Sequence, residues 1–245
     1  MSHSKNESTL DVSIVVPIYN ESECIAISLN EIAGVMDKLD YSWELLAIDD
    51  GSSDGTPAIL RELTKSIPQM RILTLVPNSG QSAAFGVGFR YARGKTIITI
   101  DADGQNDPAD IPKLLEKIKD HDCCFGYRAT RKDTFAKRIG SKFGNGIRNW
   151  ALKEDIKDTG CSLKAFPAEL ARDITMWRGM HRFLGSLLMM KGATIAQIPV
   201  NHRPRELGVS KYTNFGRLKK TIWDLQTVRW MKKRNQIFEV HEVGQ

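Results

Sequence analysis

The sequence predicts an α/β protein with a mostly parallel sheet flanked by helices and a basic amphipathic helix at the C-terminus. Two observations predict this fold. Over the first hundred residues, short apolar runs alternate with helical patterns of about 10–15 residues, as in parallel sheets that are covered on both faces. Three of the apolar runs end in a polar cluster (YNE, DDGSSD and DADGQ), so we expect a ligand site beyond the carboxyl ends of the strands.

The elements of the expected sheet follow one another in the first hundred residues. Residues 12–17 (VSIVVP) form a β-branched run that ends at a proline, and apolar side chains recur at helical spacing over residues 24–39. The next elements are a strand at 43–48, a helix at 57–66, a strand at 71–76, a helix at 78–93 and a strand at 96–100. Together they predict parallel strands joined by helices.

Beyond Asp120 the alternation is less regular. We expect helices at 135–152, 181–191 and 214–235, a strand at 193–200 and a polar loop at 202–211. No internal repeat or low-complexity linker interrupts the sequence. We therefore divide the chain into a flexible N-terminus (1–10), one α/β domain (11–213), and an amphipathic C-terminal helix with its tail (214–245).

Composition excludes several classes of protein. The chain has 245 residues, 41% of them apolar and 26% charged, which excludes wholesale disorder. Its net charge of +6 indicates an anionic partner, but no nucleic-acid-binding motif is present, so we expect no nucleic acid partner. The cysteines and histidines lack metal-ligand spacing. Without a secretory pattern or an apolar run of roughly 18 residues, we expect a cytoplasmic protein that is peripheral to the membrane.

The triplet Asp101-Ala102-Asp103 follows a predicted strand, and alternate residues there can bring two carboxylates near one point as the chain turns. Oxygen ligands of this kind suit Mg²⁺ or Mn²⁺, which bridge to phosphate oxygens and neutralise the charge that builds on a departing diphosphate. Gln105 can add a third oxygen or orient a metal-bound water. The alternative interpretation is a polar turn that water satisfies, because such triplets also occur by chance.

A second acidic cluster, residues 49–54 (DDGSSD), follows the second predicted strand. Asp50 can accept hydrogen bonds from a base or a ribose. Asp54 or Thr56 can cap the helix that follows, because side-chain oxygens at this position bind the unpaired amides of the first turn. The two interpretations are compatible, with one aspartate binding a ligand and the other capping the helix.

Four motifs occur in order at the ends of successive elements: VVPIYNE, DDGSSDGT, NSGQSAAFGVGFRYARG and DADGQNDP. They resemble family 2 glycosyltransferases of the Rossmann-like GT-A fold, and the resemblance covers residues 11–215. The segments FGYR, DTGCSLK and RELGVSKY, with the basic helix around Ser141, resemble the dolichyl-phosphate mannose synthase-like, or polyprenyl-phosphate glycosyltransferase, branch. The resemblance implies a metal-dependent, inverting transfer of a sugar from a nucleotide-sugar donor to a polyprenyl monophosphate.

The resemblance also implies a role for particular residues. For the nucleotide-sugar it implies Pro17, Tyr19, Glu21, Asp50 and Asp101. For the metal and the donor diphosphate it implies Asp101, Asp103 and Gln105, with Asp103 required for turnover. For the acceptor phosphate it implies Arg128, Ser141, Arg205 and Lys211, together with Lys137 at a position where relatives often carry an arginine. A lysine keeps the charge of an arginine but loses its bidentate fork.

Other functions remain as alternatives. A family 2 enzyme that acts on a sugar hydroxyl, in the synthesis of a surface polysaccharide or lipopolysaccharide, would need a base, and Asp158 in DTGC is the best candidate. With a phosphate acceptor, which is already a nucleophile, Asp158 would fix a loop instead. A sugar nucleotidylyltransferase would need a glycine-rich, arginine-bearing loop near the N-terminus, and the sequence has none. A non-catalytic, membrane-associated binding module would have no physical need for the DAD triplet.

The predicted C-terminal helix combines an apolar stripe with many cations. The stripe consists of Phe215, Leu218, Ile222, Leu225 and Val228, with Trp223 and Trp230 close by. A basic helix that carries tryptophan can lie at an anionic membrane surface, or it can pack its stripe on the domain. Many members of the family that the chain resembles have transmembrane helices after this region. Two alternatives follow: a peripheral protein, or an anchor that belongs to a separate membrane protein.

Overall fold

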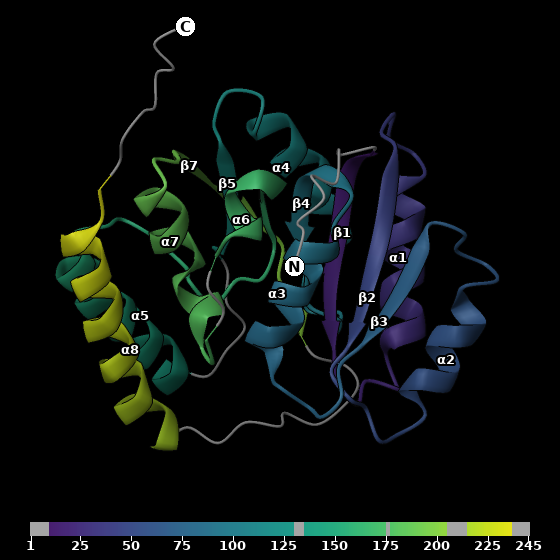
Figure 1. The fold of residues 1–245 in the computed structure, drawn as a ribbon, viewed down its shortest axis with the longest axis horizontal. Coiled ribbons are helices and arrows are strands. Elements are labelled where there is room, and N and C mark those ends of the chain that lie inside the picture. The colour runs from purple at the N-terminus through teal and green to yellow at the C-terminus, as the bar shows by residue number, and fades with distance from the viewer. Residues whose placement is uncertain (1–9, 130–134, 175–176, 205–214, 237–245) are drawn as a thin grey trace, which may run out of the picture.

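A seven-stranded sheet forms the centre of the fold (Figure 1). The computed structural model describes residues 10–129, 135–174, 177–204 and 215–236, without the side chains of residues 135–143 and 215–221. The strands are β1 (Leu10–Ile18), β2 (Trp43–Asp49), β3 (Met70–Thr74), β4 (Gly94–Thr99), β5 (Cys123–Arg128), β6 (Lys164–Pro167) and β7 (Ile195–Val200). Their order across the sheet is β3-β2-β1-β4-β6-β5-β7, and only β6 runs antiparallel to its neighbours among these strands.

Helices cover both faces of the sheet (Figure 1). The helices are α1 (Ile25–Met36), α2 (Thr56–Leu63), α3 (Gln81–Tyr91), α4 (Ile111–Lys117), α5 (Phe135–Leu152), α6 (Ala168–Arg172), α7 (Leu184–Met190) and α8 (Phe215–Arg234). Two 3₁₀ helices, η1 (Pro108–Asp110) and η2 (Met180–Phe183), precede α4 and α7. The two helices α5 and α8 lie side by side at one edge of the molecule.

The period of two along β1 divides the core into two apolar clusters. Val12, Ile14 and Val16 belong to the cluster that includes side chains of α1 and α4. Val15 belongs to the cluster on the opposite face, together with Phe89 of α3. A strand that is buried on both faces reads as a continuous apolar run, which is why VSIVV predicts a parallel strand and not an edge strand.

Helix α3 packs closely on β1 at Gly88. A Cβ atom added to this glycine would lie 2.2 Å from Cγ1 of Val15, far inside van der Waals contact. Gln81 is the first residue of α3. The close packing of α3 on β1 therefore also fixes the position of Gln81, which enters the site described below.

All the strands and helices predicted for the first hundred residues are present, with shifted ends. Helix α3 begins three residues later than predicted because residues 78–80 bind the carboxylate of Asp50 instead of entering the helix. The predicted helix at 181–191 is divided into η2 and α7. The sequence does not predict α4, β5, β6 or α6, since such short elements carry little periodicity. The division of the chain at residue 213 stays a prediction.

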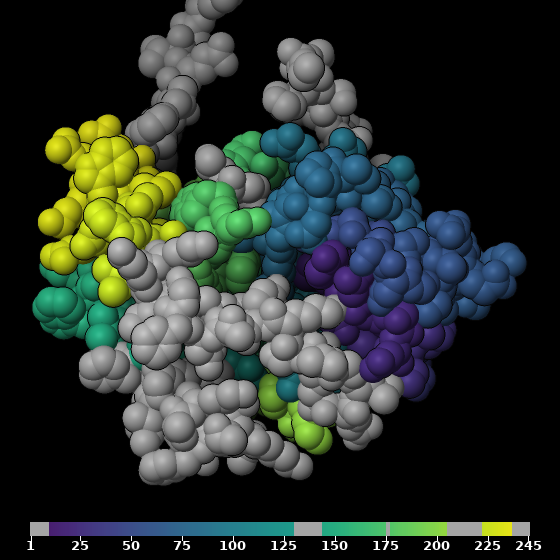
Figure 2. Space-filling view, turned by 90° about the horizontal axis from the view of Figure 1, so that it is seen from below, coloured from purple at the N-terminus to yellow at the C-terminus, as the bar shows by residue number. Residues whose placement is uncertain are grey.

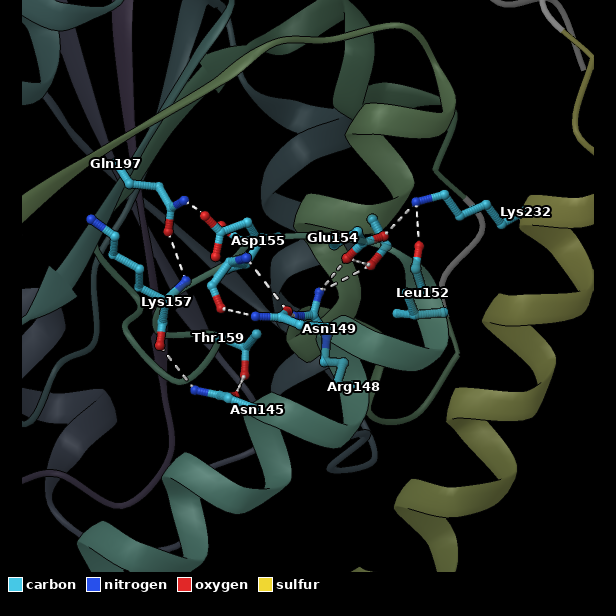
Figure 3. A network of polar contacts seen from close by, with 12 residues as sticks. Asn145, Arg148, Asn149, Leu152, Glu154, Asp155, Lys157, Thr159, Gln197 and Lys232 are labelled. Carbon is cyan, nitrogen blue, oxygen red and sulfur yellow. Dashed lines mark hydrogen bonds and ion pairs between the residues drawn. The ribbon is translucent and has the colours of Figure 1, made fainter.

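A buried carboxylate, that of Glu154, joins α5, α7 and α8 (Figure 3). Its Oε2 accepts hydrogen bonds from Nη2 of Arg148 on α5 and from Oγ of Ser186 on α7, both at 2.8 Å. From α8, Nζ of Lys232 lies 3.2 Å from Oε1 of Glu154 and donates to the carbonyl of Leu152 at 2.6 Å. These contacts hold the end of α8 against the rest of the fold.

The described side chains of α8 follow the predicted apolar stripe only in part. Val228 is buried and Leu225 packs beside it, whereas Ile222 is 50% exposed. Phe215 and Leu218 lie outside the described side chains, so the amphipathic character of the helix stays a prediction. Among the helices that the structure describes, none combines the length and the hydropathy of a membrane span.

We expect Gly88→Ala to lower the free energy of unfolding by about 1–3 kcal/mol, because the added methyl group must displace Val15 from a packed interface. Gly34→Ala is the matched control. Gly34 lies in α1 with no atom within 4 Å of the added Cβ, so alanine there should raise the free energy of unfolding by up to about 1 kcal/mol. Urea denaturation followed by circular dichroism measures both changes. Equal stability of the two variants would contradict the close packing of α3 on β1.

Candidate functional site

A cavity of about 570 Å³ lies beyond the carboxyl ends of β1, β2 and β4. Its lining includes Tyr19, Asp50, Gln81, Asp101, Lys164 and Arg182. β1 stands between β2 and β4, so the chain crosses from one side of β1 to the other at this place, as expected for a ligand site in an α/β sheet. Figure 2 shows the molecule from below. The part that contains β1 and α2 lies on one side, and the helices α5 and α8 lie on the other.

The turns that follow β1 and β2 bind each other. Asn20 adopts a left-handed backbone conformation (φ 53°), and its side-chain oxygen accepts a hydrogen bond from the amide of Ser53 at 2.7 Å. The amide of Glu21 donates to Oγ1 of Thr56 at 2.9 Å. The carboxylate of Asp54 in turn accepts from the amide of Thr56, the first residue of α2. The prediction that Asp54 or Thr56 caps α2 is wrong, because the N-cap residue is Gly55, which has no side chain to bind the amides of the first turn.

The buried carboxylate of Asp50 binds the segment that leads into α3. Oδ1 accepts a hydrogen bond from the amide of Ser79 at 2.7 Å. Oδ2 accepts from the amide of Gly80 at 2.8 Å and from the side chain of Asn78 at 2.9 Å. Gly80 has φ 91°, a conformation that favours glycine. Asp50 therefore fixes the start of α3 while it also lines the cavity, where a base or ribose is expected.

Asp101 follows β4 and lines the same cavity. Its Oδ1 accepts a hydrogen bond from Nε2 of Gln81, the first residue of α3, at 2.9 Å. Asp103 lies two residues further on, and its Oδ1 accepts from the amide of Gln105 at 3.1 Å. Gly104 makes this turn with φ 71°. The DAD triplet thus forms a turn just after the carboxyl end of β4, and its two carboxylates lie near each other.

These two carboxylates fit a divalent cation. Burial and the neighbouring charge of Asp103 raise the pKa of Asp101 to about 6, so the site disfavours its own negative charge. Within the described residues, no group of three or more His, Cys, Asp or Glu side chains is placed to hold a metal. Mg²⁺ commonly takes one or two carboxylates and completes its coordination with water and substrate phosphates. Asp101, which lines the cavity, and Asp103, which lies two residues beyond it and outside the lining, provide that donor set.

Asp158 forms a buried, bidentate ion pair with Arg128. Nε and Nη2 of Arg128 donate to the two carboxylate oxygens at 2.7 and 3.0 Å. The amides of Arg128 and Gly160 donate to the same carboxylate at 3.3 and 3.1 Å. The side chains of Arg128 and Asp158 are only 14% and 7% exposed. This geometry favours the loop-fixing interpretation of Asp158 over the role of a general base.

Lys164 is a site residue to which the sequence analysis assigns no role. It begins β6, lines the cavity and is buried, and burial lowers the pKa of its ammonium group. Nζ donates to the carbonyl of Cys161 and lies 5.4 Å from the centre of the Phe125 ring. A lysine at the end of DTGCSLK, directly before the apolar residues 165–167 (AFP), is the signal that could have found it.

A second group of unpredicted residues forms the segment 178–182, which we call the roof segment. Arg178, Gly179, His181 and Arg182 all line the cavity. The hydroxyl of Ser82 on α3 accepts a hydrogen bond from the amide of Gly179 at 2.9 Å and shares another, of 2.8 Å, with Nδ1 of His181. The basic cluster WRGMHRF, directly before an apolar helix, is the signal in the sequence.

The other predicted site residues lie away from the cavity lining or outside the description. Pro17 lies in β1, and Glu21 lies in the turn that follows β1. Lys137 and Ser141 belong to α5, but their side chains are not described; Arg205 and Lys211 lie outside the described residues. The acceptor-phosphate set therefore stays a prediction, of which the structure places only Arg128.

Comparisons with known proteins indicate the same chemistry. Residues 13–175 match the family described as Glycosyl transferase family 2. A dodecaprenyl-phosphate galacturonate synthase from Rhizobium johnstonii is 34% identical over 231 residues, which cover 92% of this chain and 68% of that protein. An undecaprenyl-phosphate 4-deoxy-4-formamido-L-arabinose transferase from Edwardsiella ictaluri is 32% identical over 219 residues, which cover 88% of this chain and 67% of that protein.

Solved structures of glycosyltransferases share the fold. A mannosyltransferase from Pyrobaculum calidifontis, in complex with GDP-Man and Mn²⁺, superposes with a TM-score of 0.63 at 18% identity, over 96% of this chain and 67% of that one. Glucosyl-3-phosphoglycerate synthase from Mycobacterium tuberculosis, in complex with Mn²⁺ and UDP-glucose, gives a TM-score of 0.66 at 15% identity, over 96% and 82%. The sheet and its helices are therefore of the GT-A type, as the resemblance implies.

We expect Asp158→Asn to lower the free energy of unfolding by about 3–5 kcal/mol, because it removes the buried negative charge that the Arg128 guanidinium binds through two hydrogen bonds. The double variant Arg128→Met/Asp158→Leu removes both charges and should recover most of that loss. Thermal denaturation of the single and double variants measures the difference. A single variant as stable as the unmodified protein would contradict the structural role of this pair.

Proposed function

Because the chain belongs to glycosyl transferase family 2, we propose that it transfers a sugar from a GDP- or UDP-linked donor to a polyprenyl monophosphate, giving a lipid-linked sugar phosphate. The observation that carries this proposal is the similarity to two relatives that are named as polyprenyl-phosphate sugar transferases or synthases. That similarity covers 92% and 88% of the chain, and so extends beyond residue 175, where the family match ends.

The state of Asp158 supports a phosphate acceptor. An oxygen of the acceptor phosphate is already negatively charged, so it can form the bond to the anomeric carbon without losing a proton. The bond from that carbon to the donor diphosphate breaks, its electron pair stays on the diphosphate oxygen, and the configuration is inverted. A sugar hydroxyl would need a base. Asp158, the candidate for that role, is held by Arg128 through both oxygens.

On the donor side, we assign the nucleoside to Pro17, Tyr19, Glu21 and Asp50. Tyr19 and Asp50 line the cavity, which supports their part in this assignment. We assign Mg²⁺ or Mn²⁺ to Asp101, Asp103 and Gln105, with Gln81 orienting Asp101. When bound, the cation neutralises charge that develops on the departing diphosphate. Lys164 adds an amino group to the same cavity.

On the acceptor side, we assign the lipid phosphate to Arg128, Lys137, Ser141, Arg205 and Lys211. A phosphate with one to two negative charges needs several cations around it, and these residues supply four. In this assignment Asp158 is a positioning residue: it fixes the plane of the Arg128 guanidinium through two hydrogen bonds.

A transfer assay tests the proposal. Radiolabelled GDP- and UDP-sugars are offered with Mg²⁺ or Mn²⁺, with and without undecaprenyl phosphate, and the product is extracted into organic solvent. We expect label in the organic phase only when both the metal and the lipid phosphate are present. Asp103→Ala should abolish transfer, because it removes a ligand of the metal that supports the leaving group. Asp120→Ala, which removes an exposed carboxylate from a loop, is the control and should stay active.

Two outcomes would contradict parts of this assignment. Label that reaches a polysaccharide or glycolipid fraction, with none on the lipid phosphate, would favour a sugar-hydroxyl acceptor. Near-normal activity of Asp103→Ala would remove the metal from Asp103.

The lipid acceptor also requires a membrane surface, and we propose peripheral association at the cytoplasmic face through α5 and α8. Trp150 on α5 and Trp223 and Trp230 on α8 are 79%, 66% and 63% exposed. Arg229 and Lys233 on α8 are exposed as well. Tryptophan and basic side chains together favour the headgroup layer of anionic lipids. The comparisons give no support to a separate anchoring protein, and it has no place in this proposal.

We expect the double variant Trp223→Ser/Trp230→Ser to sediment less with phosphatidylglycerol liposomes than the unmodified protein, because it removes two rings that can enter the headgroup layer. Tyr91→Ser is the matched control, since Tyr91 is an aromatic residue on α3 that is 51% exposed and lies outside the proposed surface. Binding should weaken in phosphatidylcholine liposomes or at high salt. Undiminished sedimentation of the double variant would count against this membrane surface.

A further inference from the structure

An arginine in the cavity lining is held from outside the cavity by the C-terminal helix. Arg182 of the roof segment lines the cavity, and its Nη2 forms an ion pair of 3.0 Å with Oδ2 of Asp224 on α8. Nε of Arg182 also donates to the carbonyl of Gly179 at 3.4 Å. The side chain of Asp224 is 19% exposed, and that of Arg182 is 32% exposed. A residue of α8 thus contacts a side chain of the cavity directly.

Gly179 lies beside this ion pair. Its φ of 96° favours glycine, and a Cβ there would lie 2.6 Å from Nη2 of Arg182 and 3.0 Å from Oδ2 of Asp224. The ion pair therefore lies directly against Gly179, and a Cβ there would make the ends of the Arg182 and Asp224 side chains shift. The same glycine donates its amide to Ser82 at 2.9 Å. One residue thus positions the ion pair and connects it to α3.

The hydrogen bond between Gly179 and Ser82 connects the roof segment to the residues of α3 on the donor side of the cavity. Ser82, which binds Gly179, directly follows Gln81, which binds Asp101. The residue before Gln81 is Gly80, which binds Asp50. The roof segment is therefore tied to the stretch of chain that holds both donor-side carboxylates.

We propose that Arg182 binds the diphosphate of the nucleotide-sugar donor and that Asp224 is the residue that positions it. This inference rests on the proposed function. When the anomeric carbon bonds to the acceptor phosphate, the electron pair of the broken bond stays on the diphosphate and adds negative charge there. A guanidinium fixed beforehand stabilises that charge without reorganising. Asp224 fixes the guanidinium, so α8 contributes to the catalytic cavity as well as to the surface of the molecule.

The acceptor phosphate is the other anion that an arginine of this site can bind. The position of Arg182 in the cavity favours the donor diphosphate. Arg182, Asp50 and Asp101 line one cavity. Arg128, the acceptor-side cation that the structure describes, is bound to Asp158 and does not belong to that lining. The donor diphosphate and the acceptor phosphate are therefore expected to bind different arginines.

The test compares Arg182→Ala, Asp224→Ala and the double variant in the full-length protein. We expect Arg182→Ala to lower kcat/KM for the nucleotide-sugar by about 100-fold or more, as for the loss of one fixed donor to a developing anion. Asp224→Ala should lower it by about tenfold, because the guanidinium remains but is less well oriented. The double variant should be no worse than Arg182→Ala alone. KM for the lipid phosphate should not change, and Asp224→Glu should restore activity.

Lys232→Met is the matched control for the docking of α8. Lys232 holds α8 to Glu154 and Leu152 without lining the cavity, so its loss should lower the melting temperature but leave KM for the donor unchanged. If Asp224→Ala and Lys232→Met change activity equally, Asp224 has only a docking role and the inference is wrong. If Arg182→Ala raises KM for the lipid phosphate and not for the donor, the arginine belongs to the acceptor.

Calorimetry with UDP and GDP in the presence of Mg²⁺ separates this inference from the proposed function, because it needs no acceptor. We expect Arg182→Ala to weaken binding of the preferred nucleotide at least tenfold, and Lys232→Met to leave it unchanged. A protein that fails to label undecaprenyl phosphate but shows this dependence on Arg182 would overturn the proposed function and support the inference. A change of less than twofold, or no binding of either nucleotide by the unmodified protein, would overturn the inference.

Discussion

The hydrogen bonds of the Asp50 carboxylate connect the end of β2 to the start of α3, on which the rest of the cavity depends. Asp50 stands at the end of β2 and accepts two backbone amides and one side-chain amide from residues 78–80. A buried donor or acceptor without its partner costs about 1–3 kcal/mol, so this segment is strongly held to β2. Because α3 begins at the next residue, Gln81 reaches Asp101 and Ser82 reaches the roof segment. Through the start of α3, the Asp50 carboxylate is thereby connected to Asp101 and to the roof segment.

The ionisable groups of the cavity fit the cation that we assign to it. Burial and the charge of Asp103 raise the pKa of Asp101 to about 6, although a hydrogen bond with Ser162 and the charges of Lys164 and Arg128 lower it. Burial thus opposes the ionised form of Asp101, and a divalent ion bound beside the two carboxylates would favour it. Arg128 is in turn committed to Asp158. The buried carboxylates of Glu44, Asp158 and Glu154 each have an arginine partner, whereas the carboxylate of Asp50 is held by amide groups.

The parts of this structure that follow from local sequence could be predicted, and the parts that follow from distant contacts could not. β1, β2 and β4 are apolar runs that end in polar clusters, so the cavity and Tyr19, Asp50 and Asp101 could be placed at their ends. The roof segment depends on contacts that span almost a hundred residues, as between Ser82 and His181, and no local pattern encodes them. The role of Asp158 was left open because the sequence cannot show which arginine it meets.

Helix α8 can serve both the membrane and the cavity because adjacent helical residues point about 100° apart. Trp223 is largely exposed, whereas Asp224, the next residue, turns inward to Arg182. Docking of the helix does not require that ion pair. Burying the side chain of Val228 contributes about 1.5–3 kcal/mol, and a partly exposed ion pair contributes little. The value of Asp224 therefore lies in orientation: it holds a flexible cation at one place in the cavity, and that place is set by the position of α8.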